Sequence, residues 1–299
     1  MLSIALTATL CFVFGAIIGS FLGVCAYRIP MGHYEPVHEG VRELASPVSI
    51  WRPARSFCPQ CEKQLLWWHN VPLVSFLLLR ARCAFCSAKI PFRYFFIELL
   101  TGALCTMCYL RFGLNPTGYA AFAVVAALVV VIFIDLDYMI IPDKITYPGI
   151  LAGLAVAAGN EYLCTPGRPF LQPPFVSNLH EAFLGLLCGP GVLLFVWGVY
   201  WLIRRREGLG LGDIKLLGVL GATFGAEASW FTILFGSILG TLFGVSAVLF
   251  RKRGFSTYIP FGPYLVAAAL MYILKLDQVV LYLIRPEGLF PWRVLQGVW

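Results

Sequence analysis

Long apolar stretches alternate with short polar ones along most of the chain, and this pattern gives the first evidence for its architecture. A helix that crosses a membrane needs about 20 mainly apolar residues, and eight stretches approach that length. They lie at about 4–27, 94–112, 117–135, 144–160, 181–203, 213–227, 229–250 and 260–284. The pattern predicts an all-α polytopic membrane protein with about eight transmembrane helices. The first stretch lacks a preceding basic segment and a small-residue cleavage site, which favours a retained anchor over a signal peptide.

One long segment, residues 28–93, departs from this membrane pattern. It is rich in proline, arginine, tryptophan and cysteine, and we expect a small cytosolic domain inserted between the first two membrane helices. The predicted organisation is a transmembrane helix over residues 1–27, the inserted domain over 28–93 and a seven-helix membrane domain over 94–299.

Composition and charge agree with this reading. Hydrophobic residues make up 60% of the chain and charged residues 12%, whereas soluble domains carry about 25% charged residues. Seventeen of the 22 lysines and arginines fall on one side of the predicted membrane, nine of them within residues 28–93. Because positive residues stay in the cytosol, that side is cytosolic and both termini lie outside. Topology thus accounts for the net charge of +7 without a nucleic-acid partner, and the expected surroundings are the lipid bilayer.

Four cysteines in the inserted domain have the spacing of a metal site. They are arranged as two CxxC pairs, Cys58 with Cys61 and Cys83 with Cys86, about twenty residues apart. This spacing is typical of a structural zinc site with four thiolate ligands and no open coordination position. Two disulfides or redox-active CxxC motifs are the alternative, which a cytosolic location disfavours. A domain this small has little core of its own, so zinc would supply much of its folding free energy.

Three aspartates lie where apolar stretches begin or end. Asp135 and Asp137 end the third stretch in the string FIDLDYMIIPDKIT, and Asp213 begins the sixth in REGLGLGDIKLLG. The alternating glycines before Asp213 (Gly208, Gly210 and Gly212) permit unusual dihedral angles and close backbone approach. Two neighbouring carboxyl groups share a proton, so one can act as general base on water while the other polarises a carbonyl. Carboxylates that simply lie at the membrane interface are the alternative interpretation.

Several strings in order along the chain resemble one enzyme family. They are GSFLGVCAYRIP (19–30), the two CxxC pairs, ELLTG (98–102), IDLDYMIIPDKIT (134–146), GLGLGDIKL (208–216) and PFGP (260–263). Together they resemble the bacterial type IV prepilin peptidases, which are GxGD-type intramembrane aspartyl proteases. The resemblance implies that Asp135 and Asp213 are the catalytic residues. Asp137 is the less favoured alternative, because in the family pattern the catalytic residue stands seven positions before the proline, here Pro142. Asp137 lies about 200° around a helix from Asp135, so the two cannot face the same partner unless the helix has ended.

The resemblance also implies a substrate and two activities. Such enzymes cleave the short basic leader of type IV prepilins or pseudopilins, at the cytosolic face of the bacterial inner membrane. Members with a zinc-type domain like this one also methylate the new amino terminus with S-adenosylmethionine, which we expect here as well. Glu98 has either a direct role in methylation or an ion pair with Arg93. Lys215 either tunes the aspartate pair or is an interfacial lysine that extends to the polar surface.

Three other functions are compatible with parts of the pattern. A GxGD protease with another membrane substrate would share the aspartates, although the paired cysteines are not expected in such relatives. An ion-coupled transporter would also carry intramembrane acids, but the inverted repeats of such folds are not evident. In a zinc-dependent assembly factor, the cysteines would matter and the aspartates would not.

Overall fold

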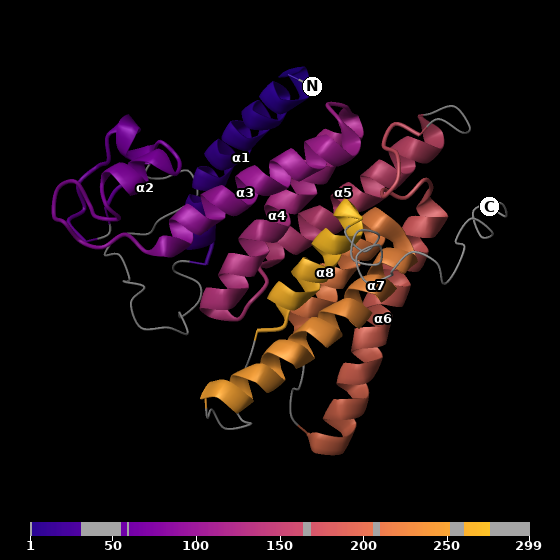
Figure 1. Cartoon of the computed structure of the whole chain (residues 1–299). Helices are drawn as coiled ribbons and strands as arrows, with labels where there is room; N and C mark the ends of the chain where they lie inside the picture. The colour runs from indigo at the N-terminus through magenta and orange to yellow at the C-terminus, as the bar shows by residue number, and fades with distance from the viewer. Residues whose placement is uncertain are drawn as a thin grey trace, which may run out of the picture.

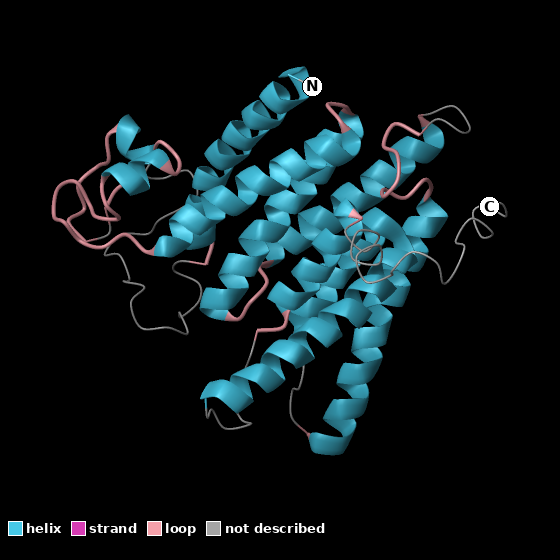
Figure 2. Cartoon of the chain, in the orientation of Figure 1, coloured by secondary structure: helices cyan, strands magenta, loops and turns pink. Residues whose placement is uncertain are grey.

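A computed structural model describes residues 2–30, 55–58, 60–163, 169–205, 210–251 and 260–275. Throughout these residues the regular structure is helical, and the only strand-like pairing consists of two isolated bridges, Phe57 with Gln64 and Arg82 with Lys89. Figure 2 shows this helical architecture, with loops concentrated in the region before the second long helix. The prediction of an all-α fold is confirmed for the described residues. Residues 31–54 of the inserted domain, Gly208 and the end of the stretch 260–284 lie outside them.

The long helices follow the apolar stretches of the sequence. Their bounds are α1 Leu2–Arg28, α3 Phe92–Phe112, α4 Pro116–Tyr138, α5 Asp143–Tyr162, α6 Leu179–Arg204, α7 Leu211–Arg251 and α8 Gly262–Leu274. Two short helices, η1 (Trp67–Asn70) and α2 (Val74–Leu78), belong to the inserted segment. Figure 1 shows this segment at one side of the bundle, next to α1 and α3.

Five helices of the described chain are long and apolar enough to cross a membrane, namely α1, α3, α4, α6 and α7. The protein is therefore a multi-pass membrane protein. Helices α5 and α8 coincide with two further predicted stretches but are not among these five, so the count of eight stays a prediction. The stretches 213–227 and 229–250 both fall within α7, where Gly225 has non-helical backbone angles (φ 84°, ψ −176°). Because these angles interrupt the helical backbone, α7 consists of two helical halves. Only glycine adopts this conformation readily.

Helix α4 occupies the centre of the bundle. It contacts α1 and α3 on one side and α8 on the other, while α7 contacts α5, α6 and α8. Its side chains Val125, Val129, Val131 and Ile134 have essentially no exposed surface. By contrast, many large hydrophobic side chains of α1 and α6 are exposed, which suits contact with lipid. Because much of α4 is buried, including Ile134 next to Asp135, a polar group near its end can be held within protein.

Candidate active site and metal site

Asp135 lies in the last turns of α4 and is buried, with 5% of its surface exposed. The helix ends just beyond it, where Met139 adopts a left-handed conformation and its N–H donates to the Asp135 carbonyl oxygen at 2.9 Å. The first residue of α8 packs directly against the carboxyl group. A Cβ atom at Gly262 would lie 2.6 Å from Oδ2 of Asp135, closer than non-bonded atoms approach. This packing of α8 on Asp135 therefore requires glycine at position 262.

Asp213 lies in the first turn of α7 and is also buried, with 7% of its surface exposed. Its N–H donates to the carbonyl of Gly210 at 3.1 Å, which closes the turn before the helix. The preceding residue, Gly212, packs against the chain after α4, where an added Cβ would lie 3.0 Å from Cβ of Ile141. The glycine-containing turn therefore brings the start of α7 against the end of α4.

The two aspartates come from helix ends about 80 residues apart in sequence, and Ile141 links their surroundings. A Cβ added at Gly212, next to Asp213, or at Gly262, which packs on Asp135, would lie within 3.4 Å of an Ile141 side-chain atom. Oδ2 of Asp135 is buried and has no hydrogen-bond partner among the described residues. The end of α4 and the start of α7 thus bring two buried carboxyl groups to the same region of the bundle.

Asp137 does not share this position. Its carboxylate forms an ion pair with Arg93 in the first turn of α3. Asp135 and Asp137 therefore point toward different neighbours, as the helical geometry predicts. Arg93, one candidate partner of Glu98, thus pairs with a different acid.

Glu98 accepts a hydrogen bond from the backbone N–H of Leu73, with an N–O distance of 2.7 Å. Of the two alternatives for Glu98, the ion pair with Arg93 is not formed in this structure, because Arg93 is engaged by Asp137. Leu73 belongs to the turn between η1 and α2. Glu98 therefore links α3 to the inserted segment, and no sequence signal at Leu73 indicated this contact.

Lys215 contacts α5 rather than the aspartate pair. Its Nζ lies 2.6 Å from Oδ1 of Asp143, the first residue of α5, and 5.2 Å from the ring centroid of Tyr147. The ion pair is partly exposed. Lys215 thus connects the start of α7 to the start of α5, and its charge is largely balanced by Asp143.

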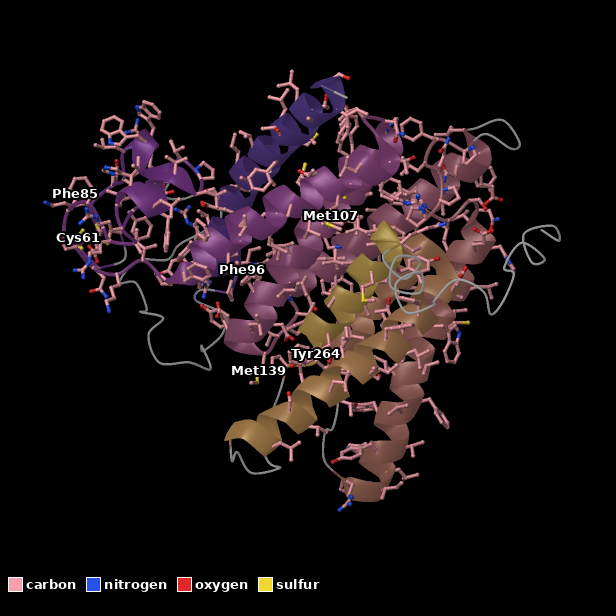
Figure 3. The ribbon with its side chains drawn as sticks, viewed as in Figure 1. Cys61, Phe85, Phe96, Met107, Met139 and Tyr264 are labelled. Carbon is pink, nitrogen blue, oxygen red and sulfur yellow. The ribbon has the colours of Figure 1, made fainter. Side chains whose placement is uncertain are left out.

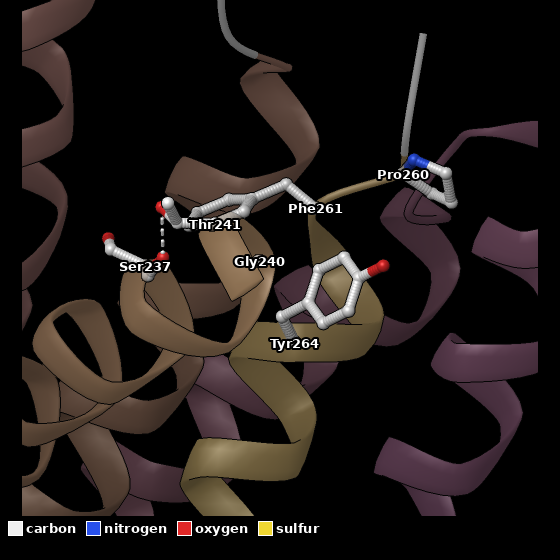
Figure 4. A pocket seen from close by; sticks show the side chains of 6 residues that line it. All are labelled: Ser237, Gly240, Thr241, Pro260, Phe261 and Tyr264. Atoms are coloured by element: carbon white, nitrogen blue, oxygen red, sulfur yellow. Dashed lines mark hydrogen bonds between the residues drawn. The ribbon is translucent and has the colours of Figure 1, made fainter. Parts of the chain in front are cut away.

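A pocket of about 350 Å³ lies beside Gly262, between the second half of α7 and the start of α8. Figure 4 shows the residues that line it, which are Ser237, Gly240, Thr241, Pro260, Phe261 and Tyr264. The Thr241 hydroxyl is occupied by a hydrogen bond to the carbonyl of Ser237 at 2.7 Å. Because Phe261 directly precedes Gly262, the pocket adjoins the residue that packs on Asp135.

The four cysteines of the inserted segment converge. Their sulfur atoms all lie within 4.8 Å of one another, and those of Cys58 and Cys86 are 3.8 Å apart. Figure 3 shows this part of the segment, around Cys61 and Phe85, at the end remote from the helix bundle. A tetrahedral zinc ion with Zn–S bonds of about 2.3 Å requires sulfur atoms about 3.8 Å apart. A disulfide would need about 2.05 Å, and all four cysteines are unpaired.

The two CxxC pairs have matching backbone geometry. In the first, the N–H of Glu62 donates to the carbonyl of Cys58 at 2.8 Å, and in the second, the N–H of Ser87 donates to that of Cys83 at 3.0 Å. Glu62 and Ser87 both have positive φ values, 56° and 58°. Burial raises the pKa of the Cys58 thiol to about 12, so metal binding must displace its proton. The cluster fits a metal ion in number, distance and donor type.

The fold and these sites define a multi-pass helical membrane protein with a buried aspartate pair and a four-cysteine cluster. Two family descriptions match the chain: the bacterial peptidase A24 N-terminal domain over residues 13–112, and the type IV leader peptidase family over residues 122–245. A prepilin leader peptidase/N-methyltransferase of Aeromonas hydrophila is 35% identical over 285 residues, covering 91% of each chain. The chain belongs to the type IV leader peptidase family and is a membrane peptidase.

Other relatives agree with this assignment. The prepilin leader peptidase/N-methyltransferase of Stutzerimonas stutzeri is 32% identical over 278 residues, or 89% of this chain and 90% of the relative. That of Burkholderia pseudomallei strain 1026b is 34% identical over 269 residues, or 85% and 81%. No solved structure gives a significant match.

Proposed function

We propose that this chain cleaves the leaders of prepilins or pseudopilins and that Asp135 and Asp213 form the catalytic pair. One observation carries this assignment: two buried carboxyl groups lie at the end of α4 and the start of α7, and the glycines beside them, Gly262 and Gly212, both pack against Ile141. Membership of the leader peptidase family and the names of the relatives support the substrate class.

The pair can perform peptide hydrolysis by general acid–base catalysis. The ionised carboxylate removes a proton from a water molecule, whose oxygen adds to the scissile carbonyl carbon. The protonated carboxyl group donates its proton to the carbonyl oxygen, giving a tetrahedral intermediate. When the intermediate collapses, the C–N bond breaks, the amine leaves with a proton returned by the pair, and the carbonyl of the new acid forms.

We place this reaction at the cytosolic face of the bacterial inner membrane. The lysine and arginine distribution supports this orientation, and Asp135 and Asp213 lie at helix ends rather than at helix midpoints. A substrate whose hydrophobic helix lies in the bilayer would present its leader junction at this depth. The pocket beside Gly262 then offers space for a substrate side chain next to the scissile bond.

We also propose two cofactors, a zinc ion and a methyl donor. Cys58, Cys61, Cys83 and Cys86 would hold one zinc ion with all four positions filled, so the ion would stabilise the domain without taking part in hydrolysis. We also propose that the enzyme methylates the new amino terminus with S-adenosylmethionine, on the basis that the relatives are named N-methyltransferases. An Asp213→Asn variant given a pre-cleaved substrate and labelled S-adenosylmethionine would still transfer methyl groups.

The decisive experiment compares cleavage of a prepilin by the purified wild type and by Asp135→Asn, Asp137→Asn and Asp213→Asn variants in detergent. We expect no detectable cleavage by the Asp135 and Asp213 variants, and cleavage within about tenfold of wild type by the Asp137 variant. Zinc content and thermal stability serve as controls for folding. Cleavage by all three variants would contradict the aspartyl mechanism. It would favour a structural role for these carboxyl groups, as in a transporter or an assembly factor.

A further inference from the structure

Residues 66–79, with the sequence LWWHNVPLVSFLLL, contain no aspartate, glutamate, lysine or arginine. Lys63 precedes this run, and Arg80 and Arg82 follow it. The structure folds the run into η1, a turn at residues 71–73, and α2. We call this element the apolar hairpin. An uncharged run of this length is too short to cross a bilayer and is typical of either a buried core helix or an interfacial or re-entrant segment. The exposure of its side chains separates these possibilities.

The hairpin exposes most of its large side chains. Trp67 is 76% exposed and Leu78 is 77% exposed. Of the described residues between 55 and 91, every exposed large hydrophobic side chain except Phe85 lies in the hairpin, and these are Leu66, Trp67, Trp68, Val74, Leu77 and Leu78. Such a concentrated apolar surface is unusual against water and marks a place of interaction.

The hairpin lies alongside a membrane helix rather than beyond its end. The Leu73 N–H donates to Glu98, which is six residues after the start of α3 at Phe92. At 1.5 Å per residue, this contact is about 9 Å along the helix. The ring of Phe76 also lies 6.2 Å from that of Phe92 and 5.2 Å from that of Phe95. Because α3 qualifies as a membrane span, the hairpin reaches the depth of its first two turns.

The hydrogen bond from Leu73 explains why an acidic residue stands in the apolar helix α3 at the depth of the membrane interface. Irregular backbone near the bilayer core must have its N–H groups satisfied by protein. Leu73, in the turn of the hairpin, has a positive φ of 61°, a conformation that bulky residues seldom adopt. The Glu98 carboxylate accepts its N–H at 2.7 Å. An acidic side chain within an apolar span thus meets a backbone group that lacks a helical acceptor.

We propose that the apolar hairpin is a monotopic membrane anchor, which inserts its exposed tryptophans and leucines into the interfacial layer of the bilayer and is fixed to α3 by Glu98. Tryptophan is enriched at this layer. The exposed Lys63, Arg80 and Arg82 flank the hairpin and complement anionic lipid headgroups. The four-cysteine cluster is then held at the membrane surface at a defined distance from α3. This proposal depends on the multi-pass membrane fold and not on the role of the aspartates.

Photocrosslinking of the full-length protein in lipid nanodiscs tests the anchor. The nanodiscs contain phosphatidylethanolamine and phosphatidylglycerol, and a photoreactive residue replaces Leu78. A matched protein carries the same residue at exposed Ala84, beside Phe85 at the end of the segment remote from α3 (Figure 3). We expect lipid adducts at position 78 at least tenfold above those at position 84. Adducts of position 78 with protein alone, no adducts there, or equal lipid labelling at both positions would overturn the proposal.

A second variant tests the apolar surface itself. Leu77→Glu combined with Leu78→Glu places two carboxylates where the anchor requires apolar contact, and Ala84→Glu is the matched control. With the photoreactive residue moved to Trp67, we expect the double variant to lose most lipid adducts while retaining bound zinc. Undiminished lipid labelling in a zinc-loaded double variant would contradict the anchor. If the double variant loses zinc, the comparison of positions 78 and 84 in the otherwise unchanged protein decides the question.

Discussion

Arg93 forms an ion pair with Asp137, and this contact joins the first turn of α3 to the last turn of α4. Because Asp137 follows Asp135 by only two residues, the ion pair fixes the rotation of the helix end that carries Asp135. Asp137, the alternative candidate for the catalytic carboxyl group, is thus engaged in an ion pair. We therefore expect Asp137 to position Asp135 and not to take part in catalysis.

We predict that Arg93→Ala lowers the free energy of unfolding by about 1–2 kcal/mol, between the values for exposed and fully buried ion pairs, because it leaves the partly buried Asp137 carboxylate without its partner. Cleavage should fall mainly through kcat, since the position of Asp135 changes while substrate contacts remain. Thermal unfolding and steady-state kinetics measure both effects. Arg111→Ala, at the far end of α3, is the matched control. An increase in KM with no change in kcat would argue against a positioning role.

Gly262→Ala should abolish cleavage or reduce it by at least about 100-fold. The added Cβ would lie 2.6 Å from Oδ2 of Asp135, and displacement of a catalytic group by about 1 Å has effects of this size. Gly159→Ala is a suitable control, because an added Cβ there meets nothing within 4 Å and alanine favours the helix. Near-normal cleavage by Gly262→Ala would show that α8 does not restrict the Asp135 carboxyl group.

Filling the pocket beside Gly262 should change substrate selection rather than chemistry. We expect Thr241→Trp to raise KM by about tenfold for a prepilin with a large residue next to the scissile bond, and less for one with alanine there. Ser246→Trp, further along α7 and outside the pocket lining, is the control. Cleavage assays with the two substrates measure the difference. Equal changes in KM for both would place the substrate elsewhere.

The cysteine cluster should carry one zinc ion per chain, measurable by elemental analysis of the purified protein. We expect Cys58→Ser to lose the metal and to lower the yield of folded protein, because one thiolate of four is removed from a small domain. Cys188→Ser, in α6 and outside the cluster, should retain the ion. Retention of stoichiometric zinc by Cys58→Ser would mean that the metal binds elsewhere or with three ligands.

Glu98→Leu should release the apolar hairpin from α3, because the N–H of Leu73 loses its acceptor. Glu98→Gln retains a carbonyl oxygen and should behave much like the wild type. Hydrogen exchange of residues 71–79 in nanodiscs measures the release, with exchange at least tenfold faster in the leucine variant. Equal exchange in both variants would show that the ring contacts of Phe76 suffice to hold the hairpin.

By itself, the sequence determined those features that depend on neighbouring residues. Apolar runs must become helices in a bilayer, because unpaired backbone groups are costly there, and this predicted α1, α3, α4 and α6. Two CxxC pairs turn tightly enough to bring their thiolates together, which predicted the cysteine cluster. Glycine at position 212 indicated close backbone approach before Asp213, and its packing against Ile141 agrees.

The tertiary structure alone decided which distant groups meet. Arg93 pairs with Asp137 rather than Glu98, Glu98 accepts from Leu73, and Lys215 pairs with Asp143. Each contact joins different elements, so it depends on the rotation and depth of packed helices, for which the local pattern carries no signal. The packing of Gly262 on Asp135 has the same origin. Sequence supplied the reactive groups, and helix packing decided which of them share one end of the bundle.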